Sequence, residues 1–452
     1  MEEIKENKMG YMPVNKLLLS MSLPMMASMM VQALYNIVDS IFVSRVSENA
    51  LTAVSMAFPL QCLMIAIAGG TCVGINAILS KALGEKDYER ANLTASNGIF
   101  LSVLSYGLFL IIGLLFVGPF YKSQTTDTEI IEYGIQYMTV VCTCSFGLFG
   151  QFIFERLLTS TGRTFYTMIT QATGAIINII FDPILIFGLF GFPKMGVTGA
   201  AVATVIGQIC AAILAYIMNV KKNPDIKISM KGFRPDGALI GEIYKIGIPS
   251  IIMQSIGSVM NYIMNKILIG FTSTAVAVFG VYYKMQSFIF MPIFGMNSGM
   301  IPIIAYNYGA KKKDRIMSTL KYAVIAATCI MLCGTLLFNL FPEWFMNLFS
   351  AQGELMTLGC VALGIISFHF VFAGFNIVVL SSYQALGNGT YALIVSVLRQ
   401  LVVILPAAFI LGKLFGVNAV WWAFPIAEVV STIVNICLFK KIYKDKIVPL
   451  TH

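Results

Sequence analysis

Long apolar runs, separated by short polar segments, follow one another along the whole chain. Each run is about 20 residues or longer, the length at which a helix crosses the hydrocarbon core of a bilayer. The pattern predicts twelve membrane-spanning helices, near residues 17–43, 51–80, 93–118, 132–155, 165–190, 196–219, 243–270, 276–307, 317–340, 358–384, 390–412 and 417–440. The predicted fold class is therefore an all-α polytopic membrane protein, with no soluble domain of any size.

Composition agrees with this class. The chain is 58% hydrophobic and only 11% charged, whereas soluble domains carry about 25% charged residues. The first residues, "MEEIKENK", are rich in acid and show no small-residue cleavage site, so no signal peptide is expected.

The basic residues indicate the orientation of the predicted helices. Most of the 30 Lys and Arg residues fall in segments on the same side as the N-terminus, beginning with Lys5, Lys8 and Lys16. The loops on the opposite side hold only Arg45, Lys122, Lys194 and Lys413. Since inner loops carry the excess of Lys and Arg, both termini are predicted to be cytoplasmic. The net charge of +9 is then a topology signal, and no nucleic-acid partner is expected.

The second half of the chain repeats the first at a fixed offset. Equivalent positions are Pro24 and Pro249, Asn36 and Asn261, Gly70 and Gly295, Gly74 and Gly299, Gly84 and Gly309, and Arg90 and Arg315. We predict an N-terminal six-helix lobe (1–219), a cytoplasmic linker (220–242) and a C-terminal six-helix lobe (243–452). Because six is even, the lobes should insert the same way up, related by a pseudo-two-fold axis along the membrane normal. Transporters built in this way usually place the substrate path between the halves.

Few acidic residues lie within the predicted spans, and Asp39 is the first. An ionised group at bilayer depth costs about 2.5–3.5 kcal/mol, so such a group is expected to face a cavity, a partner or a proton path. Gln32, Asn36 and Asp39 are spaced four and three apart, which places them on one helix face. Glu428 also lies within a span, and Glu155 lies at the inner end of the fourth.

Asn178 and Asp182 form a second polar pair, four residues apart in the fifth predicted helix. Counted from comparable helix starts, Asp39 and Asp182 lie at similar depth in the same lobe. Their repeat partners are Met264 and Ala407, so the acidic chemistry is confined to the N-terminal lobe. Two carboxylates close together in a low-dielectric cavity should not both stay ionised, so the pair can carry a proton.

Other interpretations of these acids remain open. With the Asn178 oxygen, the two carboxylates could hold a sodium ion instead of a proton. They could also serve only to cap or pair helices within the bundle. Asp182 precedes Pro183, and an Asp-Pro pair is common at a kink, which alone could explain its position.

The cations within spans lie in the C-terminal lobe. Lys266 is expected to extend toward the membrane surface, while Arg399 and Lys284 could each pair with Glu428, a structural pair being favoured for Arg399. The expected substrate cavity is lined by Gln32, Tyr35, Asn36, Lys284 and Met285.

The sequence shows no catalytic constellation. It has only two histidines and scattered cysteines, so neither a zinc motif nor a histidine-based triad is present, and it has no G-x-x-x-x-G-K-[ST] phosphate loop. We therefore expect neither an enzyme nor a resident cofactor, and no ATP-driven transport.

Several segments resemble the multidrug and toxic compound extrusion (MATE) transporters. "LPMMASMMVQALYNIVDSIFVSR" resembles their first helix, "GINAILSKALGEKDYERA" their second helix and first inner loop, and "LTSTGRTFYTMITQATGAIINIIFDPILIFG" with "MGVTGAAVAT" their fifth and sixth helices. The resemblance covers nearly the whole chain. It implies a V-shaped pair of six-helix lobes and cation-coupled drug efflux.

The resemblance also implies roles for individual residues. Asp39, Asn178 and Asp182 match the N-lobe acidic site of one branch of the family, and Thr204 matches a hydroxyl near it. Pro24 matches a proline at which the first helix is proposed to bend. Other members use acids in the C-terminal lobe, for which this chain has no obvious match.

The function expected from these features is antiport. The protein would export mostly cationic, amphipathic drugs or toxic organic cations from the cell, as a monomer in the cell membrane, in exchange for protons or sodium. Two alternatives remain: a flippase for lipid-linked precursors or polysaccharide, which would favour a cationic cavity for pyrophosphate, and a passive channel.

Overall fold

The computed structural model describes residues 6–451, and every regular element in that range is helical. Lys5, counted above among the inner basic residues, and His452 lie outside the described residues. The first half of the chain forms α1 (Lys8–Tyr11), α2 (Val14–Ser44), α3 (Glu48–Met56), α4 (Phe58–Gly84), α5 (Tyr88–Leu115), α6 (Val117–Gln124), α7 (Thr128–Thr143), α8 (Phe146–Ser160), α9 (Thr164–Phe187) and α10 (Val197–Lys222).

The second half begins after a connection at residues 223–236. It forms α11 (Gly237–Ile269), α12 (Ser273–Gly309), α13 (Lys313–Leu340), α14 (Pro342–Asn347), α15 (Glu354–Ser367), α16 (His369–Ala385), α17 (Gly389–Val397), η1 (Leu398–Val403), α18 (Ile404–Phe415), α19 (Val417–Val420), α20 (Ala423–Ile442), η2 (Tyr443–Ile447) and η3 (Val448–Thr451).

The helices confirm the predicted fold class. Within the described residues, ten helical segments are long and apolar enough to cross a membrane, and two bent pairs bring the total to twelve. Each of the twelve covers one predicted span. Several continue beyond it at the inner end, because the basic residues there, such as Lys221 and Lys222 at the end of α10, remain helical.

The two bent spans occupy equivalent places in the two halves. One joins α7 to α8 at an angle of 44°, and the other joins α15 to α16 at 45°. The repeat extends to the backbone of the inner loops, because Lys86 and Lys311, which it aligns, both have positive φ angles, 62° and 57°. The duplication is therefore visible in structure as well as in sequence.

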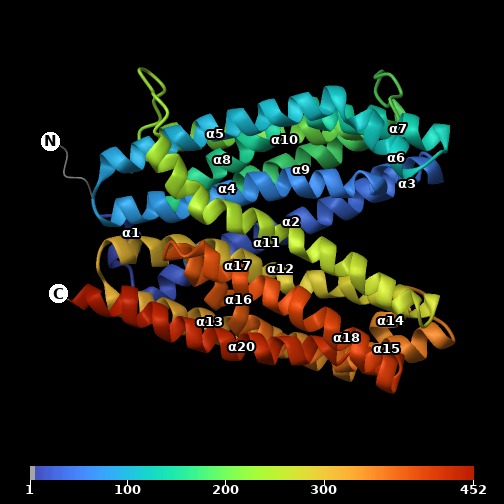
Figure 1. The fold of residues 1–452 in the computed structure, drawn as a ribbon. Helices are drawn as coiled ribbons and strands as arrows, with labels where there is room; N and C mark the ends of the chain where they lie inside the picture. The colour runs from blue at the N-terminus through green and yellow to red at the C-terminus, as the bar shows by residue number, and fades with distance from the viewer. Residues whose placement is uncertain (1–5, 452) are drawn as a thin grey trace.

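The helices of the first half lie together on one side of the molecule, and most of those of the second half lie on the other (Figure 1). Both described ends of the chain are at the same end of the bundle. The long helices α2, α4, α11 and α12 lie between the two sides, where α4 packs against α11 and α12 packs against α2.

Glycines allow these helices to approach one another closely. Gly70 and Gly74 place α4 against the α11 backbone at Gly247 and Ile243, where an added Cβ would collide. Their repeat partners Gly295 and Gly299 place α12 against the α2 backbone at Met26 and Met21. The two crossings are therefore equivalent under the internal repeat.

Gly84 and Gly309 form a third contact, at the end of the bundle that holds the termini. Gly84 packs on the α12 backbone at Tyr306, and Gly309 packs on the α4 backbone at Lys81. These repeat-related glycines therefore lie where α4 meets α12, and the two halves are in backbone contact at this inner end.

The faces that carry these glycines are exposed toward the opposite end. Leu63 lies seven residues before Gly70 on the same face of α4 and is 41% exposed, and Phe288, seven before Gly295 on α12, is 44% exposed. The faces that touch at the glycines are thus uncovered farther out. The halves are thus in backbone contact at the end that holds the termini, here called the inner end, and these faces are exposed toward the other end.

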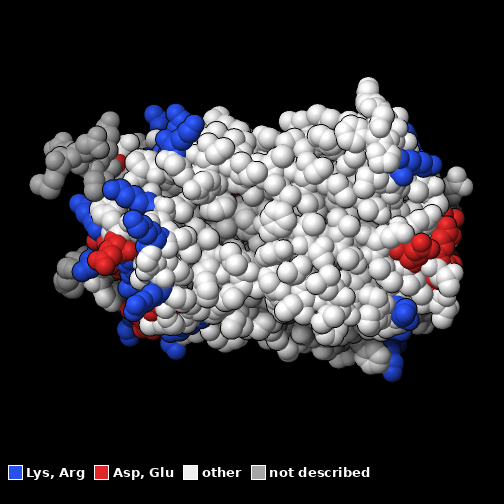
Figure 2. Space-filling view, turned by 90° about the horizontal axis from the view of Figure 1, so that it is seen from above, with Lys and Arg blue, Asp and Glu red and all other residues white. Residues whose placement is uncertain are grey.

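On the face that Figure 2 shows, charged side chains gather at the two ends and leave an uncharged middle belt. Lys and Arg predominate at one end, and Asp and Glu form a group at the other with a few basic residues near it. This distribution fits a membrane-spanning body. The predicted cytoplasmic position of the termini stays a prediction.

Candidate functional site

Helices α2 and α9 bring the two predicted acids together. Asp182 is fully buried, and the side chains of Asp39 and Asp182 lie within hydrogen-bonding reach of each other. A hydrogen bond between two carboxyl groups needs a proton on one of them, because ionised carboxylates only accept. The predicted proximity of Asp39 and Asp182 is therefore present, and its geometry suits a shared proton.

Asn178 and Thr204 complete the surroundings of Asp182. With its amide nitrogen facing the acid, Asn178 donates to Asp182 Oδ2 at 3.3 Å and accepts from the Thr204 hydroxyl and backbone N–H, each at 3.2 Å. Tyr35 lies close enough to interact electrostatically with both carboxylates. One oxygen of Asp39 and one of Asp182 are buried without a donor among the described residues.

Both prolines of interest lie inside continuous helices. Helix α9 continues through Pro183, so Asp182 belongs to a helix and not to a turn. Helix α2 likewise continues through Pro24. Proline lacks the N–H that would bond the Ser20 carbonyl, and the Thr164 hydroxyl donates to that carbonyl at 3.3 Å. The expected bend at Pro24 stays a prediction.

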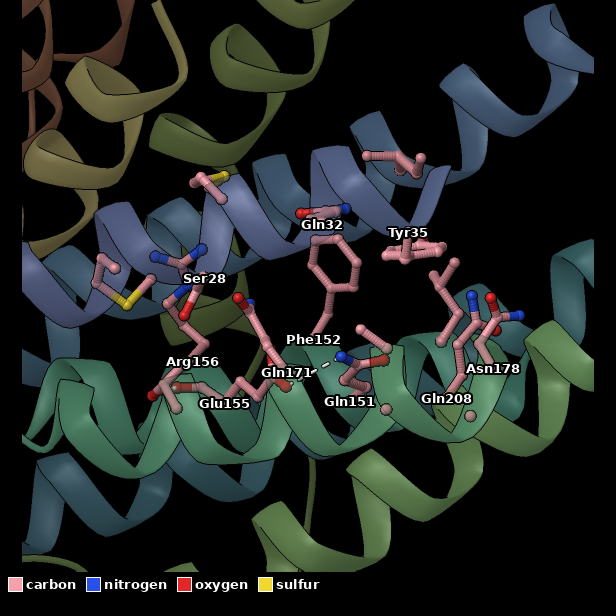
Figure 3. A pocket seen from close by; sticks show the side chains of 18 of the residues that line it. Ser28, Gln32, Tyr35, Gln151, Phe152, Glu155, Arg156, Gln171, Asn178 and Gln208 are labelled. Carbon is pink, nitrogen blue, oxygen red and sulfur yellow. Dashed lines mark hydrogen bonds between the residues drawn. The ribbon is translucent and has the colours of Figure 1, made fainter. Parts of the chain in front are cut away.

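A cavity of about 160 Å³ lies beside the acid pair, within the first half. Gln32, Tyr35 and Asn178 line it (Figure 3), as does Thr204, whereas Asp39 and Asp182 are not among its lining residues. Most of the lining comes from α2, α8, α9 and α10. Ser298 of α12 also borders it, so the cavity reaches the junction of the two halves.

Three residues expected in the cavity do not line it. Asn36 is exposed on α2, Lys284 is exposed on α12, and Met285 is buried within the second half. Lys284 lies eleven residues before Gly295, on the same face of α12. Helix periodicity indicates which residues share a face, but it cannot indicate how deep the cavity lies.

Glu155 also lines the cavity. The sequence alone places it only at the inner end of the fourth predicted span. Its buried carboxylate accepts hydrogen bonds from Gln151 Nε2 at 3.0 Å, Thr170 Oγ1 at 2.9 Å and Gln171 Nε2 at 2.8 Å. These donors lie on α8 and α9. The polar spacing of Gln151 and Glu155, four residues apart on one helix face, is the sequence signal that could have identified it.

Arg156 also lines the cavity. Sequence reasoning counted it among the inner basic residues that set topology, because it lies near the end of its helix. Figure 3 shows it beside Ser28, at the end of the cavity opposite Tyr35, Asn178 and Gln208.

The charged residues of the second half form a separate buried network. Arg399 pairs with Glu428 at 3.0 Å, as predicted, and Asn376 Nδ2 donates to the same carboxylate at 2.6 Å. His369 Nδ1 lies 3.6 Å from Glu428, and its Nε2 bonds the Tyr282 hydroxyl at 2.9 Å. Lys284 is not part of it. Every charge in this network faces a partner, so a structural role accounts for it.

Comparison with known proteins gives a consistent family. The MatE family model matches residues 24–184 and again 249–410, and these two matches start at positions that the internal repeat aligns. The chain is 28% identical over 416 residues to the multidrug export protein MepA of Staphylococcus haemolyticus (strain JCSC1435), covering 92% of this chain and 91% of that protein.

Two solved structures are also similar over nearly their whole length. One is described as an outward-facing conformation of a multidrug resistance MATE family transporter of the MOP superfamily, with a TM-score of 0.91, 26% identity, and coverage of 100% of this chain and 99% of that one. The other is a crystal structure of MATE in the straight conformation, with a TM-score of 0.91, 26% identity, and coverage of 99% of each chain.

Proposed function

Since the chain belongs to the MatE family, whose model matches both of its halves, we propose that it is a proton-coupled antiporter that exports drugs across the cell membrane. The family consists of transporters, so the protein is a multi-pass membrane transporter and not an enzyme. Multidrug export is the named activity of its MepA relatives.

The observation that carries the proposal is the Asp39–Asp182 pair. The two carboxyl groups lie close together, and a proton on one of them would let it donate a hydrogen bond to the other. When its amide nitrogen faces Asp182, Asn178 donates a hydrogen bond there and its oxygen accepts from Thr204, which leaves no Asn178 oxygen for a sodium ion. Proton coupling therefore fits the site better than sodium coupling.

The arrangement of the halves supports alternating access. The inner end is closed by backbone contact between α4 and α12, and the outer end is open, which resembles the structure described as outward-facing. In this state a proton can reach Asp39 and Asp182 from outside. Neutralising the pair changes the electrostatics beside the cavity and favours release of a cationic drug, and coupling needs only that proton and drug favour different states.

The proposal is tested by uphill dye efflux from proteoliposomes, driven either by a pH gradient or by a sodium gradient. We expect the pH gradient to drive export and the sodium gradient to have little effect. Asp39→Asn and Asp182→Asn should each lower pH-driven export by about tenfold or more, the range of typical coupling energies. Glu132→Gln removes an exposed carboxylate outside the cavity and serves as the control.

Each alternative predicts a different result. If Asp39→Asn retained pH-driven export, the proposed role of the pair would be wrong. If a sodium gradient alone drove export, the coupling ion would be sodium and not the proton. Dye movement that only dissipates its own gradient would indicate a passive channel.

A further inference from the structure

Arg156 presents an unpaired guanidinium group to the cavity. It forms no ion pair with any described residue, and its Nε is buried without an acceptor. The neighbouring group that it can reach is the Cys72 thiol, which is a weak acceptor. A guanidinium carries five N–H donors, so most of its hydrogen-bonding capacity is unused.

The other arginines of the chain are either exposed or bonded. Arg45 and Arg234 are exposed. Arg90, Arg163 and Arg399 form ion pairs with Glu242, Asp225 and Glu428, and Arg315 donates to the carbonyls of Met9 and Met12. Arg156 is therefore the exception among the described arginines.

Its sequence neighbour Glu155 interacts with it electrostatically but forms no ion pair with it. The Glu155 carboxylate is held by Gln151, Thr170 and Gln171, and no Arg156 nitrogen lies within ion-pair distance of it. The cavity lining beside it includes the Ser28 hydroxyl (Figure 3). The guanidinium therefore keeps N–H donors that a ligand in the cavity can use.

The two ends of the cavity offer different groups to a ligand, because Glu155 beside Arg156 already accepts three hydrogen bonds whereas the guanidinium keeps free donors. Arg156 lies at one end, and Tyr35 and Asn178, which neighbour the acid pair, lie at the other (Figure 3). An anionic group suits the first end, because guanidinium matches carboxylate with two parallel hydrogen bonds. A cationic group suits the second end.

We propose that Arg156 is a specificity-determining residue that binds a carboxylate of the exported molecule, so that the preferred substrates are zwitterionic amphiphiles, that is, aromatic amines that also carry a carboxylate. This inference rests on the proposed function and narrows its substrate class. The cavity of about 160 Å³ is smaller than pockets that enclose whole drugs, which are about 300–1,000 Å³. The carboxylate end of the substrate therefore enters the cavity, and the rest extends past Ser298 into the junction of the halves.

The test compares two ligands that differ only at the carboxylate: a fluorescent aromatic amino acid-type zwitterion and its methyl ester, which keeps the amine. Binding to the purified full-length protein is measured by fluorescence anisotropy. We expect the wild type to bind the zwitterion roughly 10- to 100-fold more tightly than the ester, the range of a charge-assisted contact. Arg156→Gln should remove that preference while changing ester affinity little, and Arg156→Lys should keep part of it.

Arg234→Gln, which removes an exposed arginine, is the matched control and should behave as the wild type. If Arg156→Gln weakened both ligands equally, or if the wild type favoured the ester, the inference would be overturned. If the variant did not fold, the ligand pair on the wild type alone decides, because removing the carboxylate tests the same contact. In proteoliposomes with a pH gradient, export of the ester without preference for the zwitterion refutes only this inference, whereas export of neither refutes the proposed function.

Discussion

The contact at Gly84 offers a direct way to shift the equilibrium between the outward-open and inward-open conformations. A Cβ at this position would lie 2.8 Å from the Tyr306 carbonyl carbon and 2.9 Å from the Ala310 nitrogen, both in α12. Carbon and nitrogen normally stay about 3.5 Å apart or more. Gly84→Ala should therefore hold α4 and α12 apart at the inner end.

The size of the effect follows from the contact. Overpacking of this kind costs about 1–3 kcal/mol, and the neighbouring atoms are backbone, which cannot move aside as a flexible side chain can. The cost falls on the conformation in which the inner end is closed and is absent once the halves separate there. The equilibrium should then shift toward the inward-open conformation by roughly 5- to 150-fold.

Spin labels report this shift as a distance between the two inner loops. Glu89 and Asp314 are exposed, are aligned by the repeat and lie in the first turns of α5 and α13. In a background without the nine native cysteines, cysteine labels there should show a larger long-distance population in Gly84→Ala by double electron–electron resonance. Gly280→Ala is the control, because no atom outside its own helix turn lies within 4 Å of the added Cβ. If Gly84→Ala and Gly280→Ala were both monodisperse and gave the same distance distribution, the reasoning would be refuted.

Two further predictions concern stability, measured as the melting temperature in detergent. Glu428→Gln should cost about 3 kcal/mol, the lower end of the range for a broken buried pair, because it leaves the partly buried Arg399 without its partner. Adding Arg399→Leu should recover part of that loss; no recovery would show that the ion pair is not the cause. Lys86→Gly and Lys311→Gly should each stabilise by about 1 kcal/mol, since a left-handed backbone is strained for lysine and free for glycine, whereas alanine at either position should give no gain.

The membrane class and the number of spans could be read from the apolar pattern because both depend on helix length alone. Every predicted span corresponds to a helix or a bent pair of helices. The two bends were not predicted. Neither Cys144–Ser145 nor Phe368 carries a proline or glycine signal, so these breaks depend on packing within each half.

The acid pair could be located from the sequence because each acid has polar neighbours on its own helix face. Helix spacing placed Asn178 beside Asp182, and comparable depth brought Asp39 to them, as the structure shows. Glu155 and Arg156 lacked such a signal. A charged residue near the inner end of a span is expected there for topology alone. The sequence positions of Glu155 and Arg156 therefore could not reveal that α8 directs both side chains toward a cavity.

The internal duplication places a buried glutamate with an amide donor in each half, but the two glutamates are paired differently. Gln151 and Asn376 are aligned by the repeat, and each donates to a buried glutamate, Glu155 in the first half and Glu428 in the second. In the second half Arg399 completes an ion pair with that glutamate. In the first half Arg156 is left without one and faces the cavity. Two copies of one scaffold have thus been used differently: the pairing in one stabilises a rigid bundle, and the lack of pairing in the other leaves charge available to a ligand.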